Sequence, residues 1–133
     1  MDVIITDHHT PQDKIPDTIV VHPNLPQSEY PFKELAGVGV AFKLILGLGM
    51  TLGIKSSDIF NKYVEIAAIG TISDVVPLRD ENRVIVDRGI KALKVTKNFG
   101  LSSLLDLAGV NRDLITTTSV AFGITPRINA TGR

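Results

Sequence analysis

The sequence contains no cysteine and no tryptophan, and its net charge is zero. Without cysteine the chain has no disulfide scaffold, no thiolate zinc site and no cysteine nucleophile, and this composition fits a reducing, cytoplasmic location. No apolar run is long enough to span a membrane, so we expect no membrane partner. The 133 residues are 44% hydrophobic, which suffices for one domain with a core and excludes a disordered chain.

Charge is unevenly distributed along the chain. Residues 1–78 carry five Lys against nine acidic residues, a charge of −4, whereas residues 79–133 carry nine Lys and Arg against five acidic residues, a charge of +4. All six arginines lie in the second stretch. Because the planar guanidinium suits phosphate, we expect an anionic ligand there, although a solvated basic face gives the same pattern.

The hydrophobic pattern predicts an α/β fold. Short β-branched runs at residues 3–6 and 18–21 indicate two buried strands. Helical patterns follow at residues 38–50, from Ser57 or Asp58 as N-cap to residue 69, at residues 82–95, and more briefly at residues 101–108 and 118–122. Two strands are few for a parallel sheet, which needs both faces covered. We therefore expect part of a larger parallel-sheet domain with helices packed on the sheet, truncated at the N-terminus.

Three polar residues, Asp7-His8-His9, follow the first predicted strand directly. Ligand sites in open α/β sheets lie at the carboxyl ends of strands, and carboxylate together with imidazole suits Mn²⁺, Zn²⁺ or Fe²⁺. Neighbouring side chains of an extended chain point to opposite faces, so we expect His8 and His9 to face apart and to have different roles. A polar turn with structural histidines would carry the same residues.

Two further segments carry polar side chains. Asp74, within residues 70–78, follows an apolar helix and is either a metal-binding carboxylate at the helix end or an ordinary turn residue. Residues 126–133 contain Arg127, Asn129 and Arg133, together with a glycine that allows the backbone to approach a ligand. This composition suits a phosphate clamp, and a basic terminal loop is the alternative.

In this order the segments resemble the DHH phosphoesterase superfamily and, within it, the RecJ family of single-stranded-DNA exonucleases. IITDHH at residues 4–9 resembles the motif that names the superfamily, and AGVGVAFK at residues 36–43 resembles its glycine turn into a helix. AAIGTISDVVPL at residues 67–78, followed by Glu81-Asn82-Arg83, resembles the next motif, and PRINATGR at residues 126–133 the last. The resemblance covers nearly the whole chain and implies that residues 1–133 are the C-terminal part of one DHH domain.

The resemblance implies 5′→3′ hydrolysis of single-stranded DNA in recombination and repair by a two-metal mechanism. It implies divalent ions as cofactors, Mn²⁺ first and Mg²⁺ second, with two ions in the complete enzyme. By the same resemblance the catalytic residues are Asp7, His8, His9 and Asp74. Among these, the metal ligands are Asp7, His8 and Asp74, and the residues that hold the substrate phosphate are His9, Arg127, Asn129 and Arg133.

The sequence departs from the family pattern in several places. It has no Asp-x-Asp motif, which supplies most metal-binding carboxylates in the family, and no later glycine-rich substrate-binding domain. His22, where asparagine is more usual, is interpreted as structural. We therefore expect the isolated chain to be inactive and to self-associate through an unpaired sheet edge. Two other functions stay open: a phosphodiesterase acting on oligoribonucleotides or cyclic dinucleotides, and a non-catalytic module that binds DNA or a partner.

Overall fold

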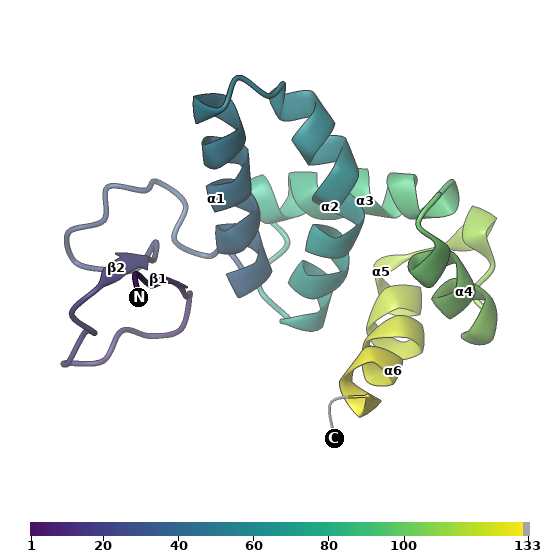
Figure 1. The fold of residues 1–133 in the computed structure, drawn as a ribbon. Coiled ribbons are helices and arrows are strands. Elements are labelled where there is room, and N and C mark those ends of the chain that lie inside the picture. Colours follow the sequence, from purple (N-terminus) through teal and green to yellow (C-terminus); the bar gives the residue numbers. More distant parts are fainter. Residues whose placement is uncertain (132–133) are drawn as a thin grey trace.

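The computed structural model describes residues 1–131, in which two short strands precede a series of helices (Figure 1). Strands β1 (Ile4–Thr6) and β2 (Ile19–Val21) pair in parallel, with Ile4 opposite Ile19 and Thr6 opposite Val21. Parallel strands need a long crossover connection, and here residues 7–18 supply it. The fold is therefore mixed α/β, as predicted, with a two-stranded parallel sheet.

The strands are more exposed than their β-branched sequence predicts. Ile4 is 55% exposed and Ile19 is 63% exposed, and the two residues are partners in the strand register. The prediction of two buried strands is therefore wrong for this structure. The reason is that nothing within residues 1–131 covers the face of the sheet that these two side chains share.

Three longer helices form the centre of the molecule: α1 (Gly37–Thr51), α2 (Ser56–Ser73) and α3 (Asp80–Lys94). A β-carbon at Gly89 would lie 2.1 Å from Ala68 Cβ, so α2 and α3 pack closely because this position is glycine. The buried apolar cluster of this region contains Leu35, Val40, Phe42, Val64, Ala67, Ala68 and Ile85. The three helices confirm the predicted ones, with bounds shifted by a few residues.

The start of α2 differs from the prediction. Its N-cap is Lys55, which makes no side-chain capping bond, so neither Ser57 nor Asp58 is the cap. Asp58 lies instead in the first turn, where a negative charge is favourable beside the positive end of the helix dipole. The sequence pattern therefore located the helix but not its first residue.

The C-terminal region is helical throughout most of its length. It comprises α4 (Phe99–Leu107), the 3₁₀ turn η1 (Arg112–Leu114), α5 (Thr117–Ser119), the π-turn η2 (Val120–Ile124) and α6 (Thr125–Ala130). A second buried cluster joins this region to α2 and α3 through Ile69, Ile72, Val86, Leu93, Leu105, Ile115, Val120 and Ile124.

Helix α6 occupies most of the segment from residue 126 onward, for which the sequence predicted a phosphate clamp, with a basic terminal loop as the alternative. Pro126 lies in its first turn, where a missing backbone N–H removes no helical hydrogen bond. The proline therefore begins the helix rather than preventing it. Arg133, predicted to hold phosphate, lies outside the described residues, as does Gly132.

Candidate metal centre

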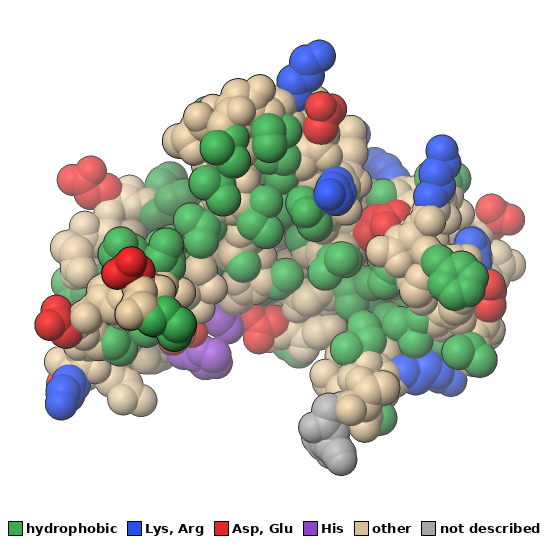
Figure 2. Space-filling model, viewed as in Figure 1, with side chains coloured by type: hydrophobic (Ala, Val, Ile, Leu, Met, Phe, Trp, Pro, Cys, Tyr) green, Lys and Arg blue, Asp and Glu red, His purple; other side chains and the backbone are tan. Residues whose placement is uncertain are grey.

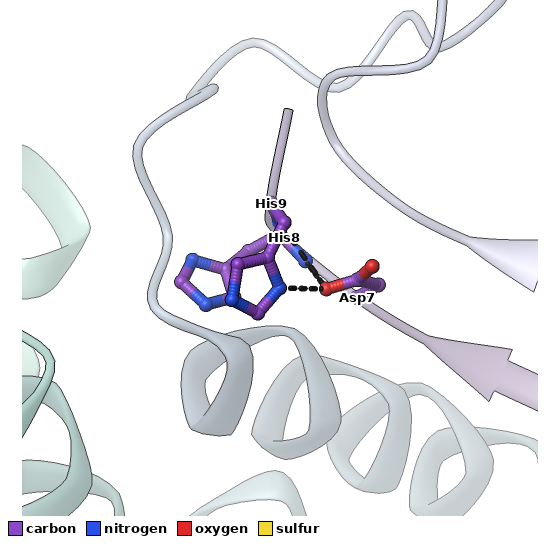
Figure 3. Close-up of side chains that lie close together, drawn as sticks. All are labelled: Asp7, His8 and His9. Carbon is purple, nitrogen blue, oxygen red and sulfur yellow. Dashed lines mark hydrogen bonds and ion pairs between the residues drawn. The ribbon is translucent and has the colours of Figure 1, made fainter. Parts of the chain in front are cut away.

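The Asp7-His8-His9 segment forms a tight turn directly after β1. The backbone N–H of Asp7 donates to Val21 O, and Asp7 Oδ1 then accepts hydrogen bonds from the backbone N–H groups of His8 and His9, at 2.7 and 3.2 Å. Such a carboxylate turn ends the extended conformation. The histidine rings consequently lie side by side, with centroids 4.5 Å apart (Figure 3). The expectation that they face apart is wrong because the strand has already ended.

Two polar residues after β2 hold this turn in place. His22, which is 8% exposed, lies with Nε2 2.8 Å from His9 O, and its Nδ1 accepts the backbone N–H of Asn24. Since Nδ1 is an acceptor, Nε2 carries the proton and donates to His9 O. Asn24 Nδ2 donates to His8 O. His22 is therefore structural, as predicted. The role of Asn24 was not predicted. Its position after β2, at the same end of the parallel sheet as the Asp7-His8-His9 turn, is the signal that could have indicated it.

His8 reaches Asp74 across the start of α1. Asp74 is the C-cap residue of α2, and its Oδ2 lies 3.2 Å from His8 Nε2, although the two residues are far apart in sequence. The imidazole approaches α1 so closely that a β-carbon at Gly37 would lie 3.0 Å from His8 Cδ2. The glycine thus makes room for the histidine ring, and the structure brings His8 and Asp74 together.

The donor atoms at this centre suit a divalent cation. One ligand atom each from Asp7, His8 and His9 lies within 4.8 Å of the others, and Asp74 adjoins this group through His8. Ligand atoms bound at about 2.0–2.3 Å from one ion lie roughly 3–5 Å apart, which these separations match. Imidazole together with carboxylate fits Mn²⁺ better than Mg²⁺, which prefers oxygen.

Asp7 and His9 form a hydrogen-bonded pair at the exposed side of the turn. His9 Nδ1 lies 2.6 Å from Asp7 Oδ1 (Figure 3). The hydrogen bond from the His9 side chain, followed by that from the His9 backbone, lowers the pKa of Asp7 to about 2. The same side-chain bond raises the pKa of His9. Asp7 is therefore a carboxylate at neutral pH, and it can bind a cation without releasing a proton.

Buried Asn82 joins the loop after Asp74 to the segment before α1. Its side chain is fully buried, and Nδ2 donates to Glu34 O at 2.6 Å and to Pro77 O at 3.0 Å. An ion pair between Arg79 and Glu34 spans the same junction. Asn82 belongs to the motif segment at residues 81–83, and the sequence alone predicted no role for it.

The predicted phosphate-binding residues lie on a separate part of the molecule. Arg127 and Asn129 are exposed on α6, and Arg127 Nη1 donates to Gly123 O at 2.6 Å. Within residues 1–131 neither forms a hydrogen bond with the metal-centre residues. Figure 2 shows the surface hollowed between the histidine side chains and the arm that ends in α6. The structure therefore places the Asp7-His8-His9 group and helix α6, which carries the predicted phosphate-binding residues, on opposite sides of a hollow.

The family model described as "DHH family, N-terminal domain" matches residues 1–71, just over half of the 133 residues. The chain therefore belongs to the DHH family. Within that family it is homologous to RecJ, as predicted. It is 48% identical over 134 residues to the single-stranded-DNA-specific exonuclease RecJ of Bacillus subtilis, covering 100% of the chain and 16% of that protein. It is 40% identical to RecJ of Thermus thermophilus, covering 19% of that protein.

Solved structures agree with this assignment. RecJ of Thermus thermophilus in complex with Mn²⁺ superimposes with a TM-score of 0.84 at 38% identity, covering 98% of this chain and 19% of that one. RecJ of the same organism in complex with Mg²⁺ gives a TM-score of 0.72 at 36% identity, over 96% of this chain and 18% of that one. The chain spans 16% to 24% of the length of the curated relatives that it matches. Among the described residues, no helix is both long and apolar enough to cross a membrane.

Proposed function

We propose that this chain supplies the DHH part of the active site of a metal-dependent 5′→3′ exonuclease that degrades single-stranded DNA in cytoplasmic recombination and repair. The observation that carries the proposal is the approach of His8 Nε2 to Asp74 Oδ2, at 3.2 Å, beside the Asp7-His9 pair. These side chains come from two segments far apart in sequence, and a purely structural turn after β1 would not need Asp74.

In the proposed site, His8, Asp74 and Asp7 bind Mn²⁺ or, less favourably, Mg²⁺. Bound divalent ions supply Lewis acidity, which stabilises the negative charge that develops on phosphoryl oxygens during hydrolysis. His9 is exposed, and the hydrogen bond that its side chain donates to Asp7 raises its pKa, so it is suited to donate a hydrogen bond to the substrate phosphate. Arg127 and Asn129 hold the nucleic-acid backbone from the opposite side of the hollow, and Arg133 is proposed to assist them.

We further propose that β1 and β2 belong to a larger parallel sheet of a DHH domain. The exposed, register-paired Ile4 and Ile19 support this, because the faces of parallel sheets are normally covered. Two ions need more anionic ligands than Asp7 and Asp74 provide, so the isolated chain is expected to bind one ion weakly and to release no nucleotides. Self-association through the open sheet edge is expected to accompany this.

Mn²⁺ binding by the chain itself tests the metal centre. We expect Mn²⁺ to broaden the imidazole NMR signals of His8 and His9, and Asp74→Asn to weaken this binding by at least about tenfold, since the loss of even an outer partner of a metal ligand costs that much. Asp87→Asn is the matched control, because Asp87 is an exposed carboxylate that pairs with Lys91 on α3. If the Asp74→Asn variant and the wild-type chain bind Mn²⁺ equally well, Asp74 does not contribute to the metal site.

A chimera tests the reaction. The chain replaces the aligned 134-residue segment of the Bacillus subtilis relative, and the product is incubated with Mn²⁺ and 5′-labelled single-stranded DNA. We expect release of mononucleotides, and loss of that activity in the Asp74→Asn chimera but not in the Asp87→Asn chimera. A folded chimera that instead cleaves short oligoribonucleotides or cyclic dinucleotides would favour the phosphodiesterase function.

A further inference from the structure

A hydroxyl pair connects the end of α2 to the start of α6. Ser73 Oγ and Thr125 Oγ1 lie 2.6 Å apart, although the residues are separated by 52 positions in sequence. Ser73 is the last residue of α2 and directly precedes Asp74, while Thr125 is the first residue of α6 and lies two positions before Arg127. The pair therefore joins the two sides of the hollow at a point next to the metal centre.

The contact distances indicate how the two hydroxyl protons are shared. Besides each other, Ser73 Oγ contacts Ile69 O at 2.7 Å and Thr125 Oγ1 contacts Val120 O at 3.2 Å. Each hydroxyl has one proton to donate. Three contacts therefore compete for two protons. If both hydroxyls donated to carbonyl groups, no proton would lie between Ser73 Oγ and Thr125 Oγ1, and two oxygen atoms only 2.6 Å apart would repel each other. The short distance favours a bond between the hydroxyls, with Ser73 donating to Ile69 O and Thr125 donating to Ser73, while the longer contact to Val120 O is left weak.

The surrounding contacts explain what the bond adds. Ile69 and Ile72 of α2 share a buried apolar cluster with Val120 and Ile124 of the π-turn. Apolar packing fixes the separation of these elements, but it is not directional. A hydrogen bond between hydroxyl groups depends on both distance and angle, so the pair fixes the rotation of α6 against α2. A π-turn beside a functional segment is also a common arrangement.

We propose that Thr125, bonded to Ser73, is a positioning residue that sets the α6 arm at a fixed place relative to Asp74. This inference rests on the proposed function, in which Arg127 and Asn129 hold phosphate while Asp74 binds the metal. Neighbouring residues at the end of α2 then serve both sides: Asp74 faces His8, and Ser73 faces α6. The arm thus keeps a set distance from the metal centre although it makes no hydrogen bond to it.

Paramagnetic relaxation by Mn²⁺ measures this placement directly. Mn²⁺ bound at the centre raises the relaxation rates of nearby protons, and this effect falls steeply with distance. The relaxation rates of the Arg127 and Asn129 amide protons therefore report how far α6 lies from the centre. In Thr125→Val, which keeps the side-chain shape but loses the hydroxyl, we expect these relaxation rates to depart from the wild-type values, because α6 is no longer held at one rotation against α2. Thr125→Ser retains a hydroxyl and is expected to restore the wild-type rates. Ser73→Ala removes the same bond from the other side and is expected to act like Thr125→Val.

The control is Thr51→Val, because Thr51 makes only a local bond to Leu48 O at the far end of α1. It is expected to leave the rates at α6 unchanged. If Mn²⁺ broadens His8 and His9 in every variant while the rates at α6 stay the same in Thr125→Val and Ser73→Ala, the positioning role is overturned and the proposed function stands. If Mn²⁺ fails to broaden the histidine signals of the wild-type chain, the proposed function is overturned and the positioning role falls with it.

Discussion

The strand segment, residues 1–35, and the helical body, residues 36–131, are held together by different interactions. In the strand segment, side chains bond to the backbone: Thr18 to Val3 O, Asn24 to His8 O, and Lys33 to Pro23 O. Apart from Leu35, the members of both buried apolar clusters lie in the helical body. Asp7, His8 and His9 lie in the first region, whereas Asp74, Arg127 and Asn129 lie in the second, so the candidate site depends on both kinds of interaction.

The largest effect is expected from opening a cavity in the helical body. Leu105 on α4 is 1% exposed, and Leu105→Ala should lower the free energy of unfolding by about 3 kcal/mol, since it removes buried methyl groups and leaves a void. Leu107→Ala on the same helix is the matched control, because Leu107 is 78% exposed. Denaturant unfolding measures both variants. Similar losses in the two would show that this region is not held by its apolar cluster.

A smaller effect is expected in the strand segment from a polar substitution. Asn24→Ala removes the hydrogen bond to His8 O and should lower the local stability of the strand pair by about 1 kcal/mol. Amide hydrogen exchange at Asp7, whose N–H donates to Val21 O, reports this loss. Asn61→Ala on the exposed side of α2 should leave that exchange unchanged. An unaltered exchange rate in Asn24→Ala would mean that apolar contacts hold the strands after all.

Backbone strain lies at the junction of the two regions, in the residue after Asp74. Val75 has φ = 58° and is 88% exposed, so its left-handed conformation is not offset by packing. Val75→Gly should raise the free energy of unfolding by about 0.5–1 kcal/mol, because the left-handed region costs a β-branched residue more than it costs glycine. Val95→Gly is the control: Val95 is also exposed but has φ = −120°, and its replacement should destabilise the chain. If both substitutions lower the free energy of unfolding, the backbone at Val75 is not strained.

The smallest effect concerns pH and the Asp7-His9 pair. The lowered pKa of Asp7, about 2 against 3.8, gives stability that is present above about pH 4 and is lost as the pH falls toward 2. The raised pKa of His9 gives stability that is present below pH 6.5 and is lost as the pH rises through the raised value. The pair is therefore most favourable between these limits, and its contribution is small because both side chains are exposed.

An NMR titration of His9 tests this pair. In Asp7→Asn the pKa of His9 should return toward 6.5, whereas Asp13→Asn, an exposed acid of the same segment, should leave it raised. An identical His9 titration in the wild-type chain and in Asp7→Asn would show that another group raises this pKa.

Local patterns were sufficient to predict the two strands and the three longer helices, because alternation and helical periodicity depend on nearby residues. Local patterns failed where contacts between distant segments, or the absence of such contacts, determine burial and secondary structure. The burial of Ile4 and Ile19 depends on what covers the sheet, and the helical state of residues 125–130 depends on packing of the π-turn against α2. A proline after a threonine does not by itself reveal whether a helix starts or stops there.

The candidate site was predictable in its residues and less so in its arrangement. Motifs identified Asp7, His8, His9 and Asp74, but the side-by-side histidine rings arise from a turn that Asp7 itself closes. The supporting roles of Asn24, Asn82 and Thr125 depend on contacts between distant segments, which a single sequence does not contain.

The start of α1 and the end of α2 both lie beside His8, and their helix dipoles create an electric field across the candidate metal centre. α1 begins at Gly37, against the His8 ring, without an acidic residue or a side-chain cap in its first turn, and α2 ends at Asp74. A helix carries about half a positive charge at its start and half a negative charge at its end. The end of α2 therefore adds to the attraction of Asp74 for a cation, while the start of α1 favours an anion. In the proposed site, the end of α2 would therefore favour the metal ion and the start of α1 would favour the substrate phosphate.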